Sequence, residues 1–279
     1  MNGLAYHPDA IVPSPIPRDI HRSEIDEFES NGVVMLPKVF SMKWIEDLRK
    51  ETERAMDAPG PFAEEYAKGA GRFFGDLDVA RRHEGFARFV FESPAARIAG
   101  KIMGTSRVNF FYDQLLVKEP GTEERTPWHQ DQPYWAVGGR DVVSIWLPLD
   151  PIAADSSLRY VAGSHRWTEF NPQHFSDGSA YEGTGLPTLP DIDRNAENYD
   201  IRSWDMEPGD CLLFQAMIVH GAPGNLSPNR RRALATRWTG NDARYVVREG
   251  EQGYPTFDPG LTQGDPMTCQ AFPLISLDD

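Results

Sequence analysis

The chain has 279 residues, of which 40% are hydrophobic and 11% aromatic. This composition supplies enough apolar side chains for a full core and excludes global disorder. The formal net charge of −14 would repel phosphate backbones, so a nucleic acid is not expected as a partner. Because no stretch in the middle of the chain resembles a linker, we expect one domain over residues 1–279.

Two further features bear on where the protein works. The sequence lacks an apolar run of about 18 residues, and the N-terminus MNGLAYHPDAIVP has neither a basic nor an apolar signal segment. Only Cys211 and Cys269 are present, which are too few for a disulfide framework. The sequence therefore predicts a cytoplasmic protein that does not contact a membrane.

The first hundred residues are predicted to be mainly helical, over about 20–105. Apolar residues recur at helical spacing in three segments, and capping residues or glycines mark several of their ends. A short apolar run, VVMLP, follows the first segment and predicts a strand. The predicted helices cover Arg22–Asn31, a segment from the cap Ser41 to about Met56, and Pro94–Met103.

From Arg107 onward the pattern changes to strands separated by turns rich in proline and glycine. No helical pattern is interleaved with these strands, which favours an antiparallel double-sheet jelly roll over a βαβ fold. We therefore predict a mainly β protein with flanking helices and a jelly-roll core over about 106–245. The predicted strands are 108–118, 141–149, 158–161, 211–220 and 231–239.

A long segment between His165 and Trp204 is dense in Gly, Pro, Asp and Asn. Loops of this length in a compact domain are usually binding lids or disordered excursions. We expect this insertion, at about 166–203, to cover a substrate site. A surface insertion without a role is the alternative.

The stretch TPWHQDQPYW contains His129 and Asp131, and His220 follows at the end of a predicted strand. Two imidazoles and one carboxylate are the ligands of facial-triad non-haem Fe(II) sites, which leave positions free for a co-substrate and dioxygen. On an extended strand, residues i and i+2 face one side about 6.6–6.8 Å apart, so His129 and Asp131 could share one ion. A second His-x-Asp pair, at 7–9, lies among prolines and is expected to be an exposed tail. For His220, a buried core histidine is the alternative.

Arg231 stands 11 residues beyond His220, at the start of the last predicted strand. An inward guanidinium there would offer two donors to a carboxylate, as a 2-oxo acid chelating the iron requires. A register slip of one residue would put Arg232 in its place. Arg237 lies on the same face as Arg231, and two positions are open for it: facing the substrate cavity, or pairing with Asp242.

Five features in this order resemble the phytanoyl-CoA dioxygenase family of Fe(II)/2-oxoglutarate oxygenases: WHQDQPYW, SIWLPLD, LRYVAGSHRW, PGDCLLFQAMIVHGA and the arginine that follows. The resemblance covers about 25–245 and implies a double-stranded β-helix core of the cupin-like kind. It implies that His129, Asp131 and His220 bind iron, that Arg231 binds 2-oxoglutarate, and that O2 is the oxidant.

By the same resemblance, Gln114, Gln130 and Trp146 fall where contacts with the co-substrate occur. The alternatives are solvent-facing amides for the two glutamines and core packing for Trp146. One departure from the family is Asp155-Ser156-Ser157, which stands where relatives often have Asn-Gly-Gly and which adds Cβ atoms to a glycine turn.

The reaction that the resemblance implies is hydroxylation of a C–H bond in a small-molecule substrate, with 2-oxoglutarate converted to succinate and CO2. Related halogenases replace the metal-binding carboxylate by Ala or Gly, so the presence of Asp131 disfavours halogenation. Two alternatives remain. One is a catalytically silent jelly-roll protein that binds a metal or small molecule, and the other is a cupin-like metalloenzyme that does not use 2-oxoglutarate. The sequence indicates neither the substrate nor the oligomeric state.

Overall fold

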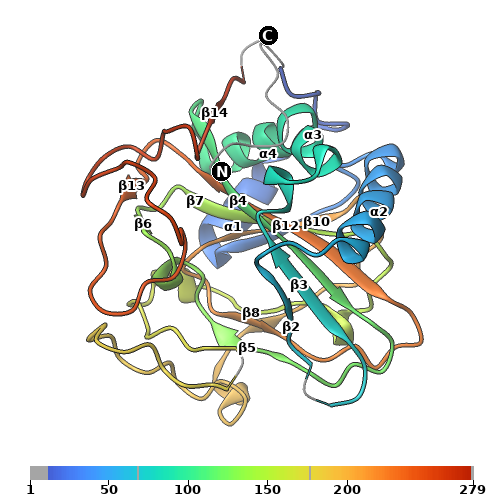
Figure 1. Ribbon diagram of the computed structural model, residues 1–279, viewed down its shortest axis with the longest axis vertical. Coiled ribbons are helices and arrows are strands. Elements are labelled where there is room, and N and C mark those ends of the chain that lie inside the picture. Colours follow the sequence, from blue (N-terminus) through green and yellow to red (C-terminus); the bar gives the residue numbers. More distant parts are fainter. Residues whose placement is uncertain (1–11, 68, 176, 278–279) are drawn as a thin grey trace.

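The computed structural model describes residues 12–67, 69–175 and 177–277, and it contains two main antiparallel sheets (Figure 1). Its mainly β architecture confirms the predicted jelly roll. The His-x-Asp pair at 7–9 lies outside the described residues. In the larger sheet the strands follow the order β1 (Val33–Leu36), β10 (Cys211–Gln215), β7 (Val142–Pro148), β12 (Arg231–Thr239), β4 (Val108–Lys118), β3 (Phe73–Leu77) and β2 (Ala63–Glu65), with β14 (Leu274–Ile275) paired to β4.

The smaller sheet carries the site described below. Its order is β5 (Thr126–His129), β11 (His220–Ala222), β8 (Arg159–Val161) and β9 (Ile201–Arg202). A separate pair is formed by β6 (Val137–Gly138) and β13 (Arg244–Tyr245). In Figure 1, β5 and β8 lie on one side of the larger sheet, and α2, α3 and α4 lie on the other.

Four α-helices occur in the described residues: α1 (Arg22–Asn31), α2 (Met42–Asp57), α3 (Glu84–Glu92) and α4 (Ala95–Met103). Short 3₁₀ helices lie at Val79–Arg81, Gln132–Tyr134, Ala154–Ser156, Ser164–Arg166 and Ala196–Asn198. The three predicted helices are therefore confirmed. No helix in the described part of the chain is long and apolar enough to cross a membrane.

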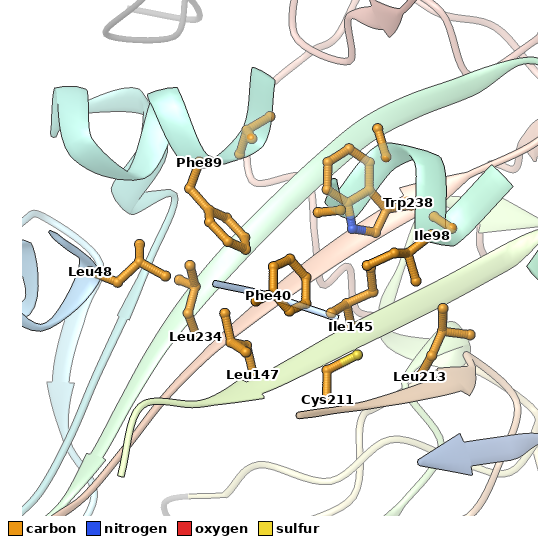
Figure 2. Close-up of a cluster of buried hydrophobic side chains, with 14 of the residues drawn as sticks. Phe40, Leu48, Phe89, Ile98, Ile145, Leu147, Cys211, Leu213, Leu234 and Trp238 are labelled. Atoms are coloured by element: carbon orange, nitrogen blue, oxygen red, sulfur yellow. The ribbon is translucent and has the colours of Figure 1, made fainter. Parts of the chain in front are cut away.

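A cluster of buried apolar side chains holds the α-helices against the larger sheet. Figure 2 shows Leu48 of α2 and Phe89 of α3 near Leu147 and Leu234 of the sheet. Each large apolar side chain buried in this way contributes roughly 1.5–3 kcal/mol. A second cluster, which includes Trp146 and other side chains of the opposite sheet face, fills the space between the two sheets. The larger sheet is therefore buried on both faces.

The prediction of one strand over 211–220 is wrong. The strand β10 ends at Gln215, and the chain turns there before it joins the smaller sheet as β11. The Gln215 side chain accepts the Met217 N–H, and its carbonyl accepts the Ile218 N–H at 3.0 Å. The apolar pattern continues through this turn because the turn is buried too, so periodicity alone does not reveal the crossing.

The predicted helical part, about 20–105, contains the four α-helices and also strands of the larger sheet. The strands β1 and β3 belong to the larger sheet, where β1 pairs with β10 and β3 pairs with β4. The run VVMLP predicts β1, but no sequence pattern predicts β2, β3 or α3. Gly75 and Asp76 interrupt the apolar pattern of β3, FFGDL, and these residue types are depleted in strands.

Replacing Asp113 in β4 tests how the burial of its carboxyl group affects the stability of the protein. Its carboxylate is fully buried and accepts the Ala80 N–H, and burial, with the charge of Asp78, raises the pKa of Asp113 to about 7. Since the folded state then binds the proton more tightly than the unfolded state, stability falls as pH rises from about 4 to 7, by at most about 1.4 kcal/mol per unit.

We expect Asp113→Asn to flatten this part of the stability profile and exposed Asp57→Asn to leave it unchanged. Urea unfolding between pH 4 and 8 measures both. A wild-type profile that runs parallel to that of Asp113→Asn would contradict the assignment.

Candidate active site

Pairing of β5 with β11 places His129 directly opposite His220. Each imidazole is oriented by a backbone carbonyl: Nδ1 of His129 lies 2.8 Å from the Pro127 oxygen, and Nδ1 of His220 lies 3.1 Å from the Ile218 oxygen. Because a carbonyl only accepts, each Nδ1 carries the proton and each Nε2 keeps its lone pair. This is the tautomer that a metal bound at Nε2 requires.

Asp131 completes the group, although not from a strand. The strand β5 ends at His129, and Asp131 has helical backbone angles, φ −72° and ψ −45°, where the 3₁₀ helix Gln132–Tyr134 begins. The expectation that both residues lie on one extended strand is therefore wrong. The Gln132 N–H donates to the Ala216 oxygen at 2.9 Å. The turn between β10 and β11 therefore holds the backbone next to Asp131 in place.

The three side chains converge on one point. Oδ1 of Asp131 lies 3.4 Å from Nε2 of His129 and 3.8 Å from Nε2 of His220. Three ligands at about 2.0–2.2 Å around one ion would stand roughly 3 Å apart, so the group needs little adjustment to accept a metal. Among the residues that the structure describes, no other group of His, Cys, Asp or Glu is placed to hold an ion. Two imidazoles and one carboxylate fit iron(II).

The surroundings keep these ligands in their metal-binding charge states. Burial alone would raise the pKa of Asp131, but His220, His129 and Arg237 outweigh it and hold that pKa below its usual range. Burial and the nearby His129 lower the pKa of His220 to about 4. Asp131 is therefore ionised and His220 neutral at pH 7. Ser144 of β7 also donates to Oδ2 of Asp131 at 3.3 Å.

Arg231 points into the space between the sheets, as predicted. It lies opposite Lys118 of β4, is 8% exposed, and donates from Nη1 to the Ser156 oxygen. Arg232 points the other way and forms an ion pair with Asp150 at 2.7 Å. The strand therefore keeps the expected register, and Ser156, in the stretch that departs from the family pattern, contacts the inward arginine.

The inner face of β12 carries two small side chains after Arg231. Ala233 and Ala235 follow Arg231 on this face, and Trp146 of β7 lies opposite Ala235. Arg237 is next and lies opposite Ser144, whose hydroxyl contacts Asp131. The two alanines therefore separate the inward Arg231 from Arg237 along one strand face.

Of the residues suggested as co-substrate contacts, two lie opposite Ala235 on the neighbouring strands. Trp146 is 3% exposed and packs in the cluster between the sheets, and Oε1 of Gln114 accepts a hydrogen bond from Nη2 of Arg237 at 3.0 Å. Gln130 is used differently: its amide bonds to the backbone of Thr168, Phe170 and Met217. Contacts of Gln114, Gln130 and Trp146 with a co-substrate stay predictions.

The segment 166–203 packs over the metal ligands. Phe175 lies against His129 with ring centroids 4.9 Å apart, and the Tyr134 hydroxyl bonds to both backbone groups of Gln173 at 2.8 Å. The cavity left between His129, Tyr134 and this segment has a volume of about 10 Å³. Such a volume holds about one water molecule, so the site is closed to any larger molecule in this conformation.

A wider cavity, of about 730 Å³, lies at the other end of the space between the sheets. Arg231, Ser156 and Asn225 are among its lining residues, and no metal ligand is. The two ends of the site thus differ: the metal end is covered, and the arginine end is reached from this cavity.

Sequence reasoning missed Ser144 and Tyr160. Tyr160 stacks on His220 with centroids 5.7 Å apart, and it is fully buried. Ser144 carried a usable signal, because a serine within the apolar strand VVSIWLP is a buried polar group that needs a partner. Tyr160 carried none, since an aromatic residue in a strand is most often core packing.

Removing one imidazole tests the metal site. We expect His129→Ala to weaken Fe(II) or Co(II) binding at least 100-fold, because two buried ligands remain where three held the ion. The control is His21→Ala, outside the cluster, which should bind like the wild type. Calorimetric titration of the apo-protein under nitrogen measures both, and unchanged affinity in His129→Ala would place the metal elsewhere.

The comparisons with known proteins agree with this geometry. The family described as phytanoyl-CoA dioxygenase matches residues 28–233. An ectoine dioxygenase from Nocardia farcinica is 22% identical over 226 residues, covering 75% of this chain and 74% of that protein. A second ectoine dioxygenase, from Stutzerimonas stutzeri, is 25% identical over 232 residues with the same coverage.

Among solved structures, the α-ketoglutarate-dependent carbocyclase SnoK from nogalamycin biosynthesis has a TM-score of 0.72 at 19% identity, over 94% of this chain and 99% of that one. The epimerase SnoN in complex with Fe³⁺, α-ketoglutarate and nogalamycin RO has a TM-score of 0.71 at 19% identity, over 90% and 97%. At this identity the likeness shows the fold. The family match over most of the sequence shows that the chain belongs to the phytanoyl-CoA dioxygenase family.

Proposed function

We propose that this protein is a non-haem Fe(II)/2-oxoglutarate-dependent dioxygenase that hydroxylates a C–H bond of a small-molecule substrate. One observation carries the proposal. A complete His129, Asp131 and His220 group shares the space between the sheets with the buried, inward Arg231. A metal-binding module has no use for that arginine, whereas a chelating dicarboxylate needs a cation at its far end.

Each part of the chain has a defined task in this reaction. His129, Asp131 and His220 would hold the iron on one side and leave its other side open. Arg231 would bind the distal carboxylate of 2-oxoglutarate and fix its position, and burial leaves the Arg231 pKa at about 10, so it stays charged at neutral pH. When bound, iron and 2-oxoglutarate supply the oxidation with O2, and 2-oxoglutarate is converted to succinate and CO2.

The segment 166–203 would act as the lid. Gln130 holds Thr168 and Phe170, and the Tyr134 hydroxyl holds Gln173, all in the first part of the segment. In the closed conformation it keeps water away from the metal ligands, and it has to open for the substrate to bind. The same proposal includes a cytoplasmic location. Two alternatives are less consistent with these residues. A silent binding protein would not need both the oriented imidazoles and Arg231. A cupin-like enzyme that does not use 2-oxoglutarate would not need Arg231.

Two neighbouring arginines provide a matched test of the co-substrate site. We expect Arg231→Gln to weaken 2-oxoglutarate binding roughly 10- to 100-fold, the loss of a charge-assisted hydrogen bond of about 1.5–3 kcal/mol. Arg232→Gln, on the opposite face, should retain the wild-type affinity. Calorimetry of Mn(II)-loaded protein gives both constants, and a larger effect in Arg232→Gln would move the anchor to the other face.

Removing one hydroxyl tests the lid. We expect Tyr134→Phe to speed amide hydrogen exchange around Gln173 at least tenfold, because both hydrogen bonds that hold this backbone are lost. Exchange in β12 should not change, which serves as the internal control. Equal exchange of the segment in both proteins would show that other contacts hold it closed.

A further inference from the structure

Arg237 is a buried cation that forms no ion pair in the part of the chain that the structure describes, although its charge helps keep the nearby Asp131 ionised. It is 5% exposed, its Nη1 donates to the Ala235 oxygen at 3.1 Å, and its Nη2 donates to Oε1 of Gln114 at 3.0 Å. Its Nε has no hydrogen-bond partner in the described residues. Asp242, the partner considered from the sequence, instead accepts the N–H groups of Arg140 and Asp141.

The guanidinium of Arg237 lies at the metal end of the site. Arg237 is opposite Ser144 on one neighbouring strand and opposite Tyr112 on the other. Its Cζ lies 4.7 Å from the centre of the Tyr112 ring and 5.9 Å from the centre of the Trp135 ring. Directly beyond Arg237 the pairing of β12 with β4 shifts by a bulge, a feature that often occurs beside active sites.

Burying a charge without a counter-charge is costly, so a guanidinium in this position calls for an anion. The proposed co-substrate does not supply one. Iron(II) and Asp131 leave one positive charge, Arg231 adds another, and 2-oxoglutarate brings two negative charges, so these groups already sum to zero.

Two neighbouring ionisable groups do not change this balance. Burial and the nearby Arg231 lower the pKa of Lys118 to about 6, so Lys118 is mainly neutral at pH 7. Asp113 bonds through its carboxylate to the Ala80 N–H, and its neighbours Leu115 and Val117 on the same strand face belong to the cluster beneath the helices. It therefore faces away from the space between the sheets. The positive charge of Arg237 is left over.

We propose that Arg237, with its guanidinium held in place by Gln114, binds a carboxylate or similar oxyanion of the substrate, and hence that the substrate is an anion. This inference rests on the proposed oxygenase function. The same chemistry could come from the carboxylate of 2-oxoglutarate next to its keto group. The charge balance favours the substrate as the source, and the binding experiment below distinguishes the two.

The first test is thermal stability of the protein loaded with Mn(II), in which the metal ion rather than Arg237 balances the charge of Asp131. Methionine fills a similar volume without charge, so Arg237→Met should melt at the wild-type temperature or above it, as expected where a buried charge is kept for a ligand. Arg232→Met is the control: it breaks the ion pair with Asp150 and should melt lower. If Arg237→Met instead melts several degrees below the wild type, the guanidinium is structural and the proposal is overturned.

The second test uses acetate and acetamide as probes at constant ionic strength. They are added anaerobically to the Fe(II)–2-oxoglutarate complex, and the shift of its visible charge-transfer band is followed. We expect the wild type to bind acetate at least tenfold more tightly than acetamide. Arg237→Met should lose this preference, while its dissociation constant for 2-oxoglutarate stays within twofold of the wild-type value.

Two results would overturn the substrate assignment: equal binding of both probes by the wild type, or weaker 2-oxoglutarate binding in Arg237→Met, which would make the co-substrate the anion. Failure of the band to form with 2-oxoglutarate is a different outcome. It would reject the oxygenase function, and the anionic substrate with it.

Discussion

The whole site depends on the antiparallel pairing of two short strands, β5 and β11, which sets His129 opposite His220. Both strands are too short to be stable alone. They are held because the chain leaves the larger sheet at Gln215, turns through buried apolar residues and joins the smaller sheet as β11. The carbonyls of this backbone orient both imidazoles. The metal ligands are therefore positioned by the buried connection between the two sheets and not by surface loops.

The larger sheet supplies the other half of the chemistry. On the inner face of β12, arginines stand at both ends of two alanines, so one strand carries a cation, two small side chains and a second cation in line. The helices stabilise this strand from its other face, where Leu234 packs among buried apolar side chains (Figure 2). A rigid strand suits this task, because the distance between a co-substrate anchor and the metal has to be kept closely.

Much of this could be predicted from the sequence, for identifiable reasons. Alternation in β12 fixed which arginine points inward, and the structure confirms that Arg232 forms its ion pair on the opposite face. The sequence did not show where β10 ends, because the turn after Gln215 is as apolar as the strand. Nor did it show the helical backbone of Asp131, since convergence of side chains depends on tertiary contacts such as that of Gln132 with Ala216. The sequence placed Arg237 on the same strand face as Arg231, but it did not show that Arg237 lies near Asp131.

The proposed reaction requires one metal ion and 2-oxoglutarate to bind together at this site. The most direct measurement is anaerobic titration of the metal-free protein with Fe(II) and then 2-oxoglutarate, followed by visible absorption. The account predicts a weak charge-transfer band that needs both components and does not form in Asp131→Ala. Tight Fe(II) binding without any band on addition of 2-oxoglutarate would contradict it, and would assign the site to a binding protein or to another metal chemistry.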